Sequence, residues 1–412
     1  MTVRVALIVP ALSEPGGVRA VAEFIVRTIR NKTDFDLKIV SLAMSSRDAC
    51  STLVRRPSSW FGGIKYSIGI FCGEKFTHVG ARFGDTELMR YRPRRHLTAL
   101  LADCDLIQVV AGTPCWALPV VGLGTPVVLQ VATLVSVERR RRIKLGRGFS
   151  GLWWRAMTLI VSYLDKIALR KVDAVLVENQ WMLAHVQSAA TEGRPIVSFA
   201  PPGIDTSLFS PAQPRLISQT YILTVGRFDD PRKNVGLLID AYNQCCVQRA
   251  NFPKLLIAGA SPPPAEFWER AKILGLIDKI QFRENPSDQE LADLYRNALC
   301  FVLTSDEEGL GLVVIEAMAS GIPVVSTRSG GPDDIITDGV DGFLIDRDDI
   351  RALSDRLILL TETPDLNADI GLRARATALE KYSEDATGEA YVALYKQLLA
   401  EVTTQPHSSL PK

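Results

Sequence analysis

Short apolar runs alternate with longer amphipathic stretches along most of the chain. Such runs are typical of buried strands and the stretches between them of helices, so the pattern predicts an α/β fold. The predicted strands are 5–9, 37–42, 106–110, 127–131 and 174–177 in the first half, and 221–225, 255–258, 280–282, 300–303 and 323–326 in the second. The predicted helices are 18–29, 235–245, 265–274, 287–297, 312–320 and 382–401.

The stretch 200–214, rich in proline and polar residues, separates the two series of elements. A chain of 412 residues also exceeds what a single hydrophobic core usually serves. We therefore predict a first domain of residues 1–202 and a second domain of residues 203–382. A helix at about 383–402 is expected to complete the first domain, and residues 403–412 are expected to form a flexible tail.

Two apolar stretches resemble targeting or membrane segments. Residues 3–12 contain Arg4 and lack a cleavage site, so we predict a buried first strand and a cytoplasmic protein. Residues 117–135 contain Pro119, Pro126 and Gln130, so we predict two buried strands around a turn in place of a spanning helix.

Composition indicates an ordinary globular protein, with 47% hydrophobic and 23% charged residues. The seven cysteines are odd in number and form no C-x-x-C pair, and the four histidines are scattered. This pattern predicts thiols in a reducing compartment, and it predicts neither a metal site nor a cofactor.

Charge divides the chain into a basic half and an acidic half. Residues 1–200 hold 27 Lys and Arg against 15 Asp and Glu, a net charge of +12, and the remainder holds 20 against 31, a net charge of −11. A basic half suits contact with a membrane surface or an anionic acceptor. The asymmetry equally suits two domains that attract each other, and the sequence leaves both explanations open.

The strongest chemical pattern lies at 300–321, where a predicted strand leads into a glycine-containing loop and then a helix. Such a junction presents free backbone N–H groups and the positive end of a helix to an anion. Gly309 and Gly311 allow the backbone to approach the anion closely. Glu308 in the loop is expected to accept hydrogen bonds from sugar hydroxyls, and Glu316 in the helix from ribose hydroxyls.

The E-x7-E spacing from Glu308 to Glu316, the run EGLGLVVIEAMASGIPVV and the segment 329–333 resemble the retaining family-four glycosyltransferases, or glycosyltransferase group 1. The resemblance implies the GT-B fold, in which two facing Rossmann-like domains enclose a deep cleft with the active site. Residues 201–205 are similar to the family's hinge sequence, and the likeness is densest from about 200 to 345.

A second motif, Thr224–Asn234, resembles the first strand and loop of the family's nucleotide domain. The resemblance implies that Arg227 and Lys233, next to Gly226, bind the diphosphate of the donor. Two fixed cations stabilise the negative charge of the departing diphosphate more in the transition state than before it. No divalent metal is then required.

Gly16 and Gly17 lie between the first predicted strand and the first predicted helix. Glycines there permit a tight turn and close approach to a phosphate or the acceptor, although a plain turn would also use them. The family has a matching glycine pair that lines the cleft.

One position departs from the family. Where the family commonly has a histidine after the strand 127–131, this chain has Ala132. In the family that histidine contacts the donor sugar or its surroundings. Its loss leaves three interpretations open: a different donor, a shifted role for Thr133 or Gln130, or reduced activity.

Residues 139–154 combine basic with aromatic side chains. Cations beside tryptophans suit a membrane interface, and the family includes peripheral enzymes that dock through the first domain. The alternative, which we prefer, is a surface loop whose tryptophans pack under the following helix, since nothing in the sequence shows that the basic and aromatic residues share a face. No nucleic-acid motif accompanies the basic run, so no nucleic-acid partner is expected.

The resemblance thus implies a metal-independent retaining hexosyltransferase of the EC 2.4 class, at the inner face of a membrane. Its substrates would be a UDP- or GDP-type sugar and a glycan, lipid-linked or small-molecule acceptor. The alternative is a catalytically degenerate nucleotide-sugar-binding subunit of a glycosyltransferase complex. The predicted catalytic residues are Arg227, Lys233 and Glu308; the predicted donor-binding residues are Gly226, Arg227, Lys233, Glu308, Gly309, Gly311, Leu312, Val313 and Glu316; the predicted acceptor loop contains Gly16 and Gly17.

Overall fold

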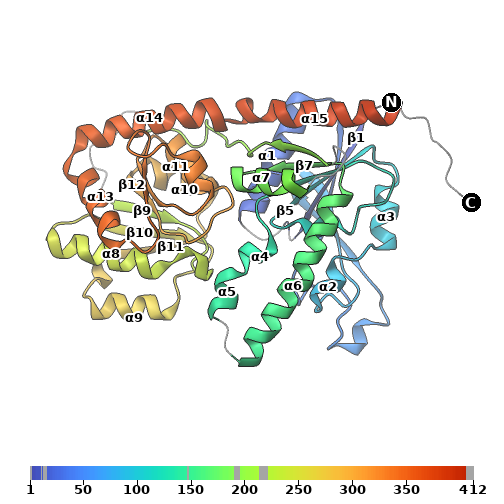
Figure 1. Ribbon diagram of the computed structural model, residues 1–412, viewed down its shortest axis with the longest axis horizontal. Coiled ribbons are helices and arrows are strands. Elements are labelled where there is room, and N and C mark those ends of the chain that lie inside the picture. The colour runs from blue at the N-terminus through green and yellow to red at the C-terminus, as the bar shows by residue number, and fades with distance from the viewer. Residues whose placement is uncertain are drawn as a thin grey trace, which may run out of the picture. The chain divides into compact units, whose positions relative to one another are not determined.

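The computed structural model describes residues 2–10, 12, 16–145, 148–189, 195–212 and 221–404. By its internal contacts the chain divides into two units. Unit 1 comprises Met1–Pro202 with Thr387–Lys412, and unit 2 comprises Gly203–Ala386. Each unit is built around one sheet with helices packed on it (Figure 1).

Unit 1 contains an eight-stranded sheet in the order β3-β4-β2-β1-β5-β6-β7-β8, parallel except for the β3–β4 pair at one edge. Its strands are β1 (Arg4–Pro10), β2 (Asp36–Leu42), β3 (Tyr66–Phe71), β4 (Glu74–Val79), β5 (Leu106–Ala111), β6 (Val127–Val131), β7 (Ala174–Val177) and β8 (Ile196–Phe199). Its helices are α1 (Gly17–Lys32), α2 (Glu87–Arg90), α3 (Arg95–Leu101), α4 (Val135–Glu138), α5 (Arg140–Leu145), α6 (Gly148–Lys171), α7 (Gln180–Ala189) and most of α15 (Glu384–Thr404).

Unit 2 contains a six-stranded parallel sheet in the order β11-β10-β9-β12-β13-β14. Its strands are β9 (Tyr221–Val225), β10 (Lys254–Gly259), β11 (Ile280–Glu284), β12 (Ala298–Leu303), β13 (Val324–Thr327) and β14 (Phe343–Ile345). Its helices are α8 (Val235–Gln248), α9 (Ala265–Ile273), α10 (Asp288–Arg296), α11 (Leu312–Ala319), α12 (Gly331–Ile335), α13 (Ile350–Glu362) and α14 (Pro364–Tyr382).

The predicted α/β class with two Rossmann-like sheets is confirmed. Parallel strands covered by helices on both faces bury most of their side chains, which is why the central strands read as nearly continuous apolar runs. In β1, for example, every residue from Val5 to Pro10 is buried. In unit 2, two separate core clusters surround the sheet, one containing Leu223 of β9 and the other its neighbour Ile222.

The C-terminal helix α15 is tied into unit 1 by two tyrosines. Tyr391 and Tyr395 are fully buried, and the Tyr391 ring meets Phe24 of α1 edge-on with centroids 5.1 Å apart. The Tyr391 hydroxyl donates to Gln130 Oε1 at 3.0 Å, and the Tyr395 hydroxyl donates to Gln108 Oε1 at 2.9 Å. The last helix of the chain therefore completes the core of the unit that the first residues begin.

One predicted pair of strands is wrong, one predicted helix has shifted boundaries, and one predicted segment is mostly untested. The stretch 117–135 holds one strand, β6, in place of two, because the chain forms a short 3-10 helix at Pro114–Ala117 and then turns. The helix predicted at 382–401 is α15, which begins at Glu384 because Ser383, between α14 and α15, has extended backbone. The predicted tail 403–412 falls mostly outside the described residues.

The segment 139–154 is not a surface loop, which corrects the preferred interpretation of the sequence. It forms α5 and the start of α6. Trp153 is 57% exposed instead of packing under a helix, while Trp154 lies under the guanidinium of Arg139, 5.4 Å from the ring centroid. Among the described residues, no helix combines the length and hydrophobicity that crossing a membrane requires.

Candidate functional site

The predicted donor site centres on the junction of β12 and α11 in unit 2. β12 ends at Leu303, and α11 begins at Leu312 after a short loop that contains Glu308 and Gly309. Gly311 caps the helix with φ at 93°, a left-handed conformation that a side chain would strain. The N–H groups of Leu312 and Val313 have no acceptor within the helix, as at any helix start, so this turn offers donors to an anion.

The segment 329–331 holds the backbone of Glu308 in place. The Glu308 N–H donates to the Ser329 carbonyl at 2.8 Å, and the Gly331 N–H donates to the Glu308 carbonyl at 3.2 Å. A Cβ on Gly331 would lie 2.0 Å from the Leu310 carbonyl oxygen, so only glycine fits there. This close approach explains why glycine is needed in the segment 329–333, which the sequence analysis identified only by its resemblance.

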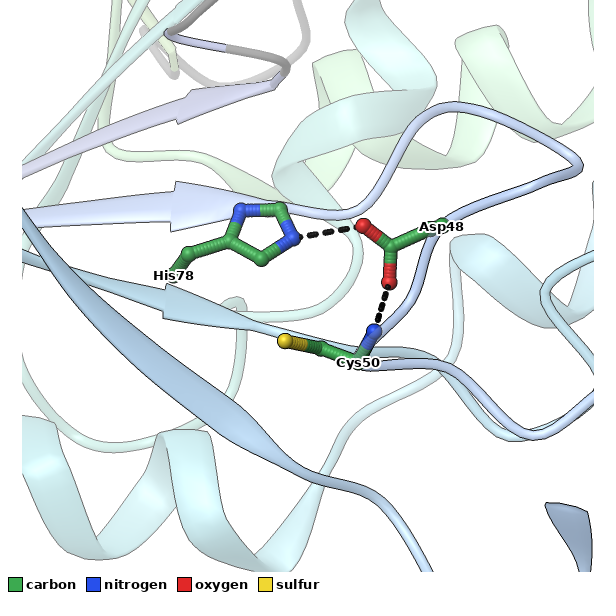
Figure 2. Close-up of side chains that lie close together, drawn as sticks. All are labelled: Asp48, Cys50 and His78. Carbon is green, nitrogen blue, oxygen red and sulfur yellow. Dashed lines mark hydrogen bonds and ion pairs between the residues drawn. The ribbon is translucent and has the colours of Figure 1, made fainter.

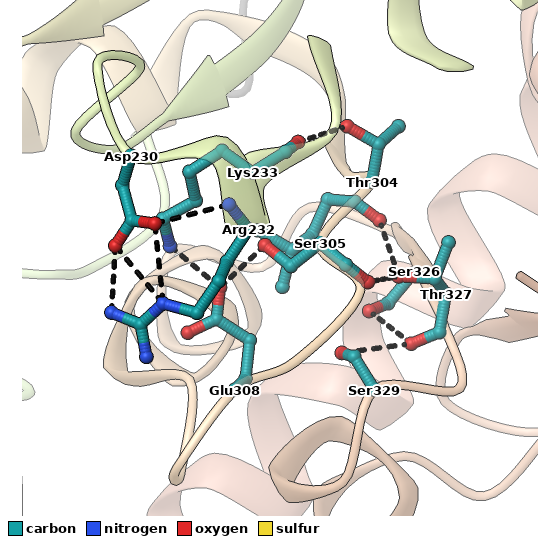
Figure 3. A network of polar contacts seen from close by, with 10 residues as sticks. Asp230, Arg232, Lys233, Thr304, Ser305, Glu308, Ser326, Thr327 and Ser329 are labelled. Carbon is teal, nitrogen blue, oxygen red and sulfur yellow. Dashed lines mark hydrogen bonds and ion pairs between the residues drawn. The ribbon is translucent and has the colours of Figure 1, made fainter. Parts of the chain in front are cut away.

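Lys233 and Glu308 form an ion pair in the middle of a polar network (Figure 3). Lys233 Nζ lies 2.5 Å from Glu308 Oε1, and the Ser305 hydroxyl donates to the same oxygen at 2.5 Å. The two charged side chains are only 15% and 14% exposed. Burial opposes ionisation of Glu308, but the Lys233 ammonium and the Ser305 hydroxyl outweigh it, so the pKa of Glu308 is lowered. The structure thus brings together two predicted site residues as a charged pair.

The turn that carries Lys233 is fastened to the β12–α11 loop at three points. The Thr304 hydroxyl donates to the Lys233 carbonyl at 3.0 Å. The Asp306 N–H donates to the Arg232 carbonyl at 2.8 Å, and the Asn234 amide donates to the Asp306 carboxylate at 2.8 Å. Because β9 and β12 are neighbours in the sheet, these contacts join the carboxyl ends of two adjacent strands.

Arg227 lies in the same turn, and its side chain is exposed. Its neighbour Gly226 leaves room for Lys233, because a Cβ on Gly226 would lie 3.3 Å from Lys233 Cε. Sequence reasoning missed the ion pair between Arg232 and Asp230, whose atoms lie 2.6 Å apart. Burial opposes ionisation of Asp230, but the hydrogen bond from Arg232 and the nearby charges of Arg232 and Arg227 outweigh it, so the pKa of Asp230 is lowered. Three cations therefore share this turn.

Glu316 lies in α11 as expected, but one of its oxygens already has a partner. The Tyr295 hydroxyl lies 2.8 Å from Glu316 Oε2 and 3.2 Å from the Val313 carbonyl oxygen. Burial raises the pKa of Glu316 to about 7. A phenol has one hydrogen, so when Glu316 is protonated its own hydroxyl can donate to Tyr295 while Tyr295 donates to Val313. Tyr295 carries no recognisable sequence signal, yet it positions this carboxyl group.

In unit 1, the predicted acceptor loop lies between β1 and α1. Gly16 has φ at 140°, which favours glycine, and α1 begins at Gly17. A Cβ on Gly17 would meet no atom of the described residues within 4 Å. The preceding residues Glu14 and Pro15 lie outside the described residues.

A chain of hydrogen bonds supports the backbone just before this loop. The Leu12 N–H donates to Ser41 Oγ at 3.3 Å, and Ser41 Oγ lies 3.0 Å from His78 Nδ1. His78 Nε2 lies 2.7 Å from the Asp48 carboxylate, whose other oxygen accepts from the Cys50 N–H (Figure 2). The ligand atoms of Asp48, Cys50 and His78 lie within 4.8 Å of one another, a group that sequence spacing did not predict because His78 comes from β4. These hydrogen bonds indicate a structural role for the group, which is to support the backbone of Leu12.

Ala132 and Gln130 have separate surroundings at the end of β6. The Ala132 carbonyl accepts from the Asn179 amide at 3.0 Å. Gln130 is buried, donates to Glu178 at 3.1 Å, and accepts from Tyr391 of α15. Burial raises the pKa of Glu178 to about 7. Gln130 therefore holds the C-terminal helix.

Comparisons with known proteins identify the family and the fold. The family described as "Glycosyl transferases group 1" matches residues 211–377. The chain is 30% identical over 353 residues to the GDP-mannose-dependent alpha-(1-6)-phosphatidylinositol monomannoside mannosyltransferase of Mycolicibacterium smegmatis, covering 78% of this chain and 91% of that relative. It is 26% identical over 354 residues to the MMP alpha-(1->4)-mannosyltransferase of Mycolicibacterium hassiacum, covering 85% and 82%. The solved sucrose-phosphate synthase of Thermosynechococcus elongatus superposes with a TM-score of 0.71 at 18% identity, covering 97% of this chain and 100% of that chain.

Proposed function

Because this chain belongs to the glycosyl transferases group 1 and has the GT-B fold, we propose that it is a metal-independent, retaining enzyme with its donor site in unit 2. As a member of that family it is a glycosyltransferase of the hexosyltransferase class and uses a nucleotide-sugar donor. The proposal adds the stereochemistry, the independence from metal ions and the roles of single residues. Unit 1 binds the acceptor, beside Gly16 and Gly17.

The ion pair between Lys233 and Glu308 is the observation that carries the proposal. Without a donor, each charge of the pair neutralises the other at 2.5 Å. A diphosphate would draw Lys233 away from the carboxylate, and Glu308, still ionised, would accept hydrogen bonds from the sugar hydroxyls. Arg227 in the same turn, and the N–H groups that start α11, supply further groups for the phosphates.

The transfer takes place on one face of the sugar. The acceptor oxygen bonds to the anomeric carbon on the face from which the diphosphate departs. The bond from that carbon to the diphosphate oxygen breaks, its electron pair stays on the oxygen, and the proton of the acceptor hydroxyl passes to the diphosphate. Arg227 and Lys233 stabilise the charge that grows on the leaving group, so their effect is larger in the transition state than in the bound ground state.

The relatives guide the choice of substrates. Two of them are named as mannosyltransferases, one of them GDP-mannose-dependent and acting on a phosphatidylinositol monomannoside. GDP-mannose is therefore the first donor to test, ahead of UDP-sugars. A lipid-linked acceptor is the first acceptor class to test, with unit 1 in peripheral contact with a membrane at its cytoplasmic face.

A catalytically degenerate subunit that binds a nucleotide sugar for a partner enzyme is the second candidate. Ala132 favours it, because a small apolar side chain stands where the family commonly has a histidine. Such a subunit would bind the donor at unit 2 but would neither transfer nor hydrolyse it.

Product analysis tests the proposal. GDP-mannose and UDP-sugars are incubated with lipid and glycan acceptor extracts, with and without EDTA, and the anomeric configuration of the product is read by NMR. We expect an α-linked product from an α-linked donor, with EDTA causing no loss. A β-linked product would contradict retention, and loss with EDTA would contradict metal independence. Donor binding without transfer or hydrolysis would favour the degenerate subunit.

A further inference from the structure

The long helix α6 of unit 1 has two opposite faces. One face packs into the unit through Met157, Val161, Asp165 and Ala168, all of them buried. These positions recur every three or four residues, so they lie on one side of the helix. The opposite side faces away from the core.

Apolar side chains dominate that opposite side, which we call the α6 outer face. Leu159 is 74% exposed, and Leu152 and Tyr163 are each 66% exposed. At 100° per residue these three positions fall within a narrow strip, and Trp153 and Ile160 lie along its border. An exposed apolar strip on one helix indicates a surface that contacts a membrane or another protein. The α6 outer face comprises Leu152, Trp153, Ala156, Leu159, Ile160 and Tyr163.

Every charged side chain exposed on α6 is positive. Arg155 and Lys166 border the apolar strip on one side, and Arg170 and Lys171 follow at its C-terminal end. Asp165, the one acidic residue in α6, is turned inward. It accepts hydrogen bonds from the N–H of Cys115, in the 3-10 helix after β5, and from the N–H of Val135, at the start of α4. The residues of unit 1 hold 29 Lys and Arg against 17 Asp and Glu, a net charge of +12.

We propose that the α6 outer face docks on the surface of an anionic lipid bilayer. Leu159 and Ile160 enter the boundary between headgroups and acyl chains, and aromatic rings such as Trp153 lie at headgroup level. The stems of Arg155 and Lys166 reach outward so that their charges meet lipid phosphates. The helix lies in the plane of the interface. This inference rests on the proposed function, because it brings the acceptor-binding unit to a lipid-linked acceptor.

Charge distinguishes the bilayer from a second copy of the chain. Pairing two α6 outer faces would place the exposed cations of one copy beside those of the other, and each unit 1 carries a net charge of +12. Like charges in that arrangement repel. A surface of lipid phosphates complements both the apolar strip and its basic border.

Vesicle flotation tests the docking. The full chain is mixed with phosphatidylcholine vesicles, or with vesicles that contain about 30% phosphatidylglycerol. We expect at least about tenfold stronger binding to the anionic vesicles, weakening as salt rises. Leu159→Glu should reduce this binding at least about tenfold, because a carboxylate replaces an inserted side chain beside anionic lipid. Trp153→Ala should reduce it by a smaller factor.

A matched control lies in unit 2. Ile273 of α9 is 84% exposed, and Ile273→Glu makes the same chemical change away from α6. It should leave vesicle binding unchanged. The proposal is overturned if the parent chain does not float with anionic vesicles, or if Leu159→Glu floats as well as the parent. It is also overturned if Leu159→Glu converts a dimer to a monomer without any vesicle binding, since the face would then join two copies.

Arg227→Ala separates this inference from the proposed function. It should lose donor binding and keep vesicle binding. A chain that transfers sugar to a dissolved acceptor but does not float would refute the docking alone. A chain that floats but binds no nucleotide sugar would refute the donor site alone.

Discussion

The two sheets use polar side chains in opposite ways. In unit 2, the carboxyl ends of β9 and β12 are joined around ionised groups, above all the pair of Lys233 and Glu308. In unit 1, buried amides of the central strands β5 and β6 meet tyrosine hydroxyls of α15, such as Gln130 with Tyr391. The carboxyl group next to Gln130, that of Glu178, has its pKa raised to about 7 by burial.

The difference distinguishes a ligand-binding site from a contact that holds two elements of the fold together. A largely buried ion pair can exchange one partner for a charged ligand at little cost, because the ligand replaces the lost charge. A fully buried network of neutral groups loses a hydrogen bond whenever a partner leaves, so it holds two elements together. A variant at the charged pair of unit 2 should therefore lower activity, whereas a variant at the amide–tyrosine contacts of unit 1 should lower stability.

The largest effect is expected at Lys233. Lys233→Ala removes a cation that faces the leaving diphosphate, so kcat/KM should fall by about 10²–10³-fold in steady-state transfer assays. The fold should survive, because Ser305 still donates to Glu308. Arg249→Ala, which breaks an exposed pair with Glu362 in the same unit, should leave kcat/KM unchanged. Full activity of Lys233→Ala would remove the distinction between the two sheets.

Gly331→Ala tests the backbone of the same site. The new Cβ would meet the Leu310 carbonyl oxygen at 2.0 Å, so the loop that carries Glu308 must shift. We expect a loss of about 2–3 kcal/mol in the free energy of unfolding, together with weaker donor binding by calorimetry. Gly236→Ala is the control, because its Cβ would lie 3.8 Å from its nearest neighbour. Equal behaviour of the two variants would contradict the tight fit.

Tyr391→Phe should affect stability and leave turnover of the folded enzyme unchanged. It removes the buried hydroxyl that lies 3.0 Å from Gln130 Oε1 and 2.8 Å from the Ala200 carbonyl oxygen, and the loss of this hydrogen bond should cost about 1–3 kcal/mol. Urea unfolding measures the change, and Tyr163→Phe, which alters an exposed hydroxyl, serves as the control. A drop in kcat without a drop in stability would mean that this network belongs to the active site.

The last effect concerns the pH dependence of stability and involves Glu316, the group of unit 2 that most resembles the buried groups of unit 1. Its pKa is raised from 4.5 to about 7, so the folded chain keeps a proton that the unfolded chain releases. Its stabilising contribution is complete below about pH 4.5 and is lost as the pH rises through 7, an effect of about 3 kcal/mol at most. Glu316→Gln should make the melting temperature less dependent on pH between these values. An unchanged pH dependence would show that Glu316 is ionised in the folded chain.

Local patterns predicted most of the parallel strands, since burial on both faces leaves an apolar run in the sequence. The edge strand β3 was not predicted, because Tyr66, Ile68 and Ile70 are exposed and their alternation does not mark a buried face. β14 escaped because it has only three residues. The α6 helix was missed because its outer face is apolar, which hides the usual contrast between a buried and a polar side.

Within the candidate site, residues that are close in sequence could be predicted, but contacts between distant residues could not. Glu308, Gly309 and Gly311 lie in one contiguous string, so their pattern could be recognised. Nothing local shows that Lys233 meets Glu308 across 75 positions, or that Gln130 meets Tyr391 across 261. Contacts of that kind depend on which strands become neighbours, and a single sequence does not contain that information in readable form.

Titration calorimetry of GDP-mannose, UDP-sugars and ADP-sugars tests the donor site of unit 2 most directly. Each donor is titrated into the parent chain and into Arg227→Ala, with and without EDTA. We predict binding of at least one donor to the parent chain, unchanged by EDTA and lost in Arg227→Ala. Absence of binding for every donor at about a millimolar, where even weak ligands register by mass action, would contradict the account. Binding that survives in Arg227→Ala would place the donor elsewhere.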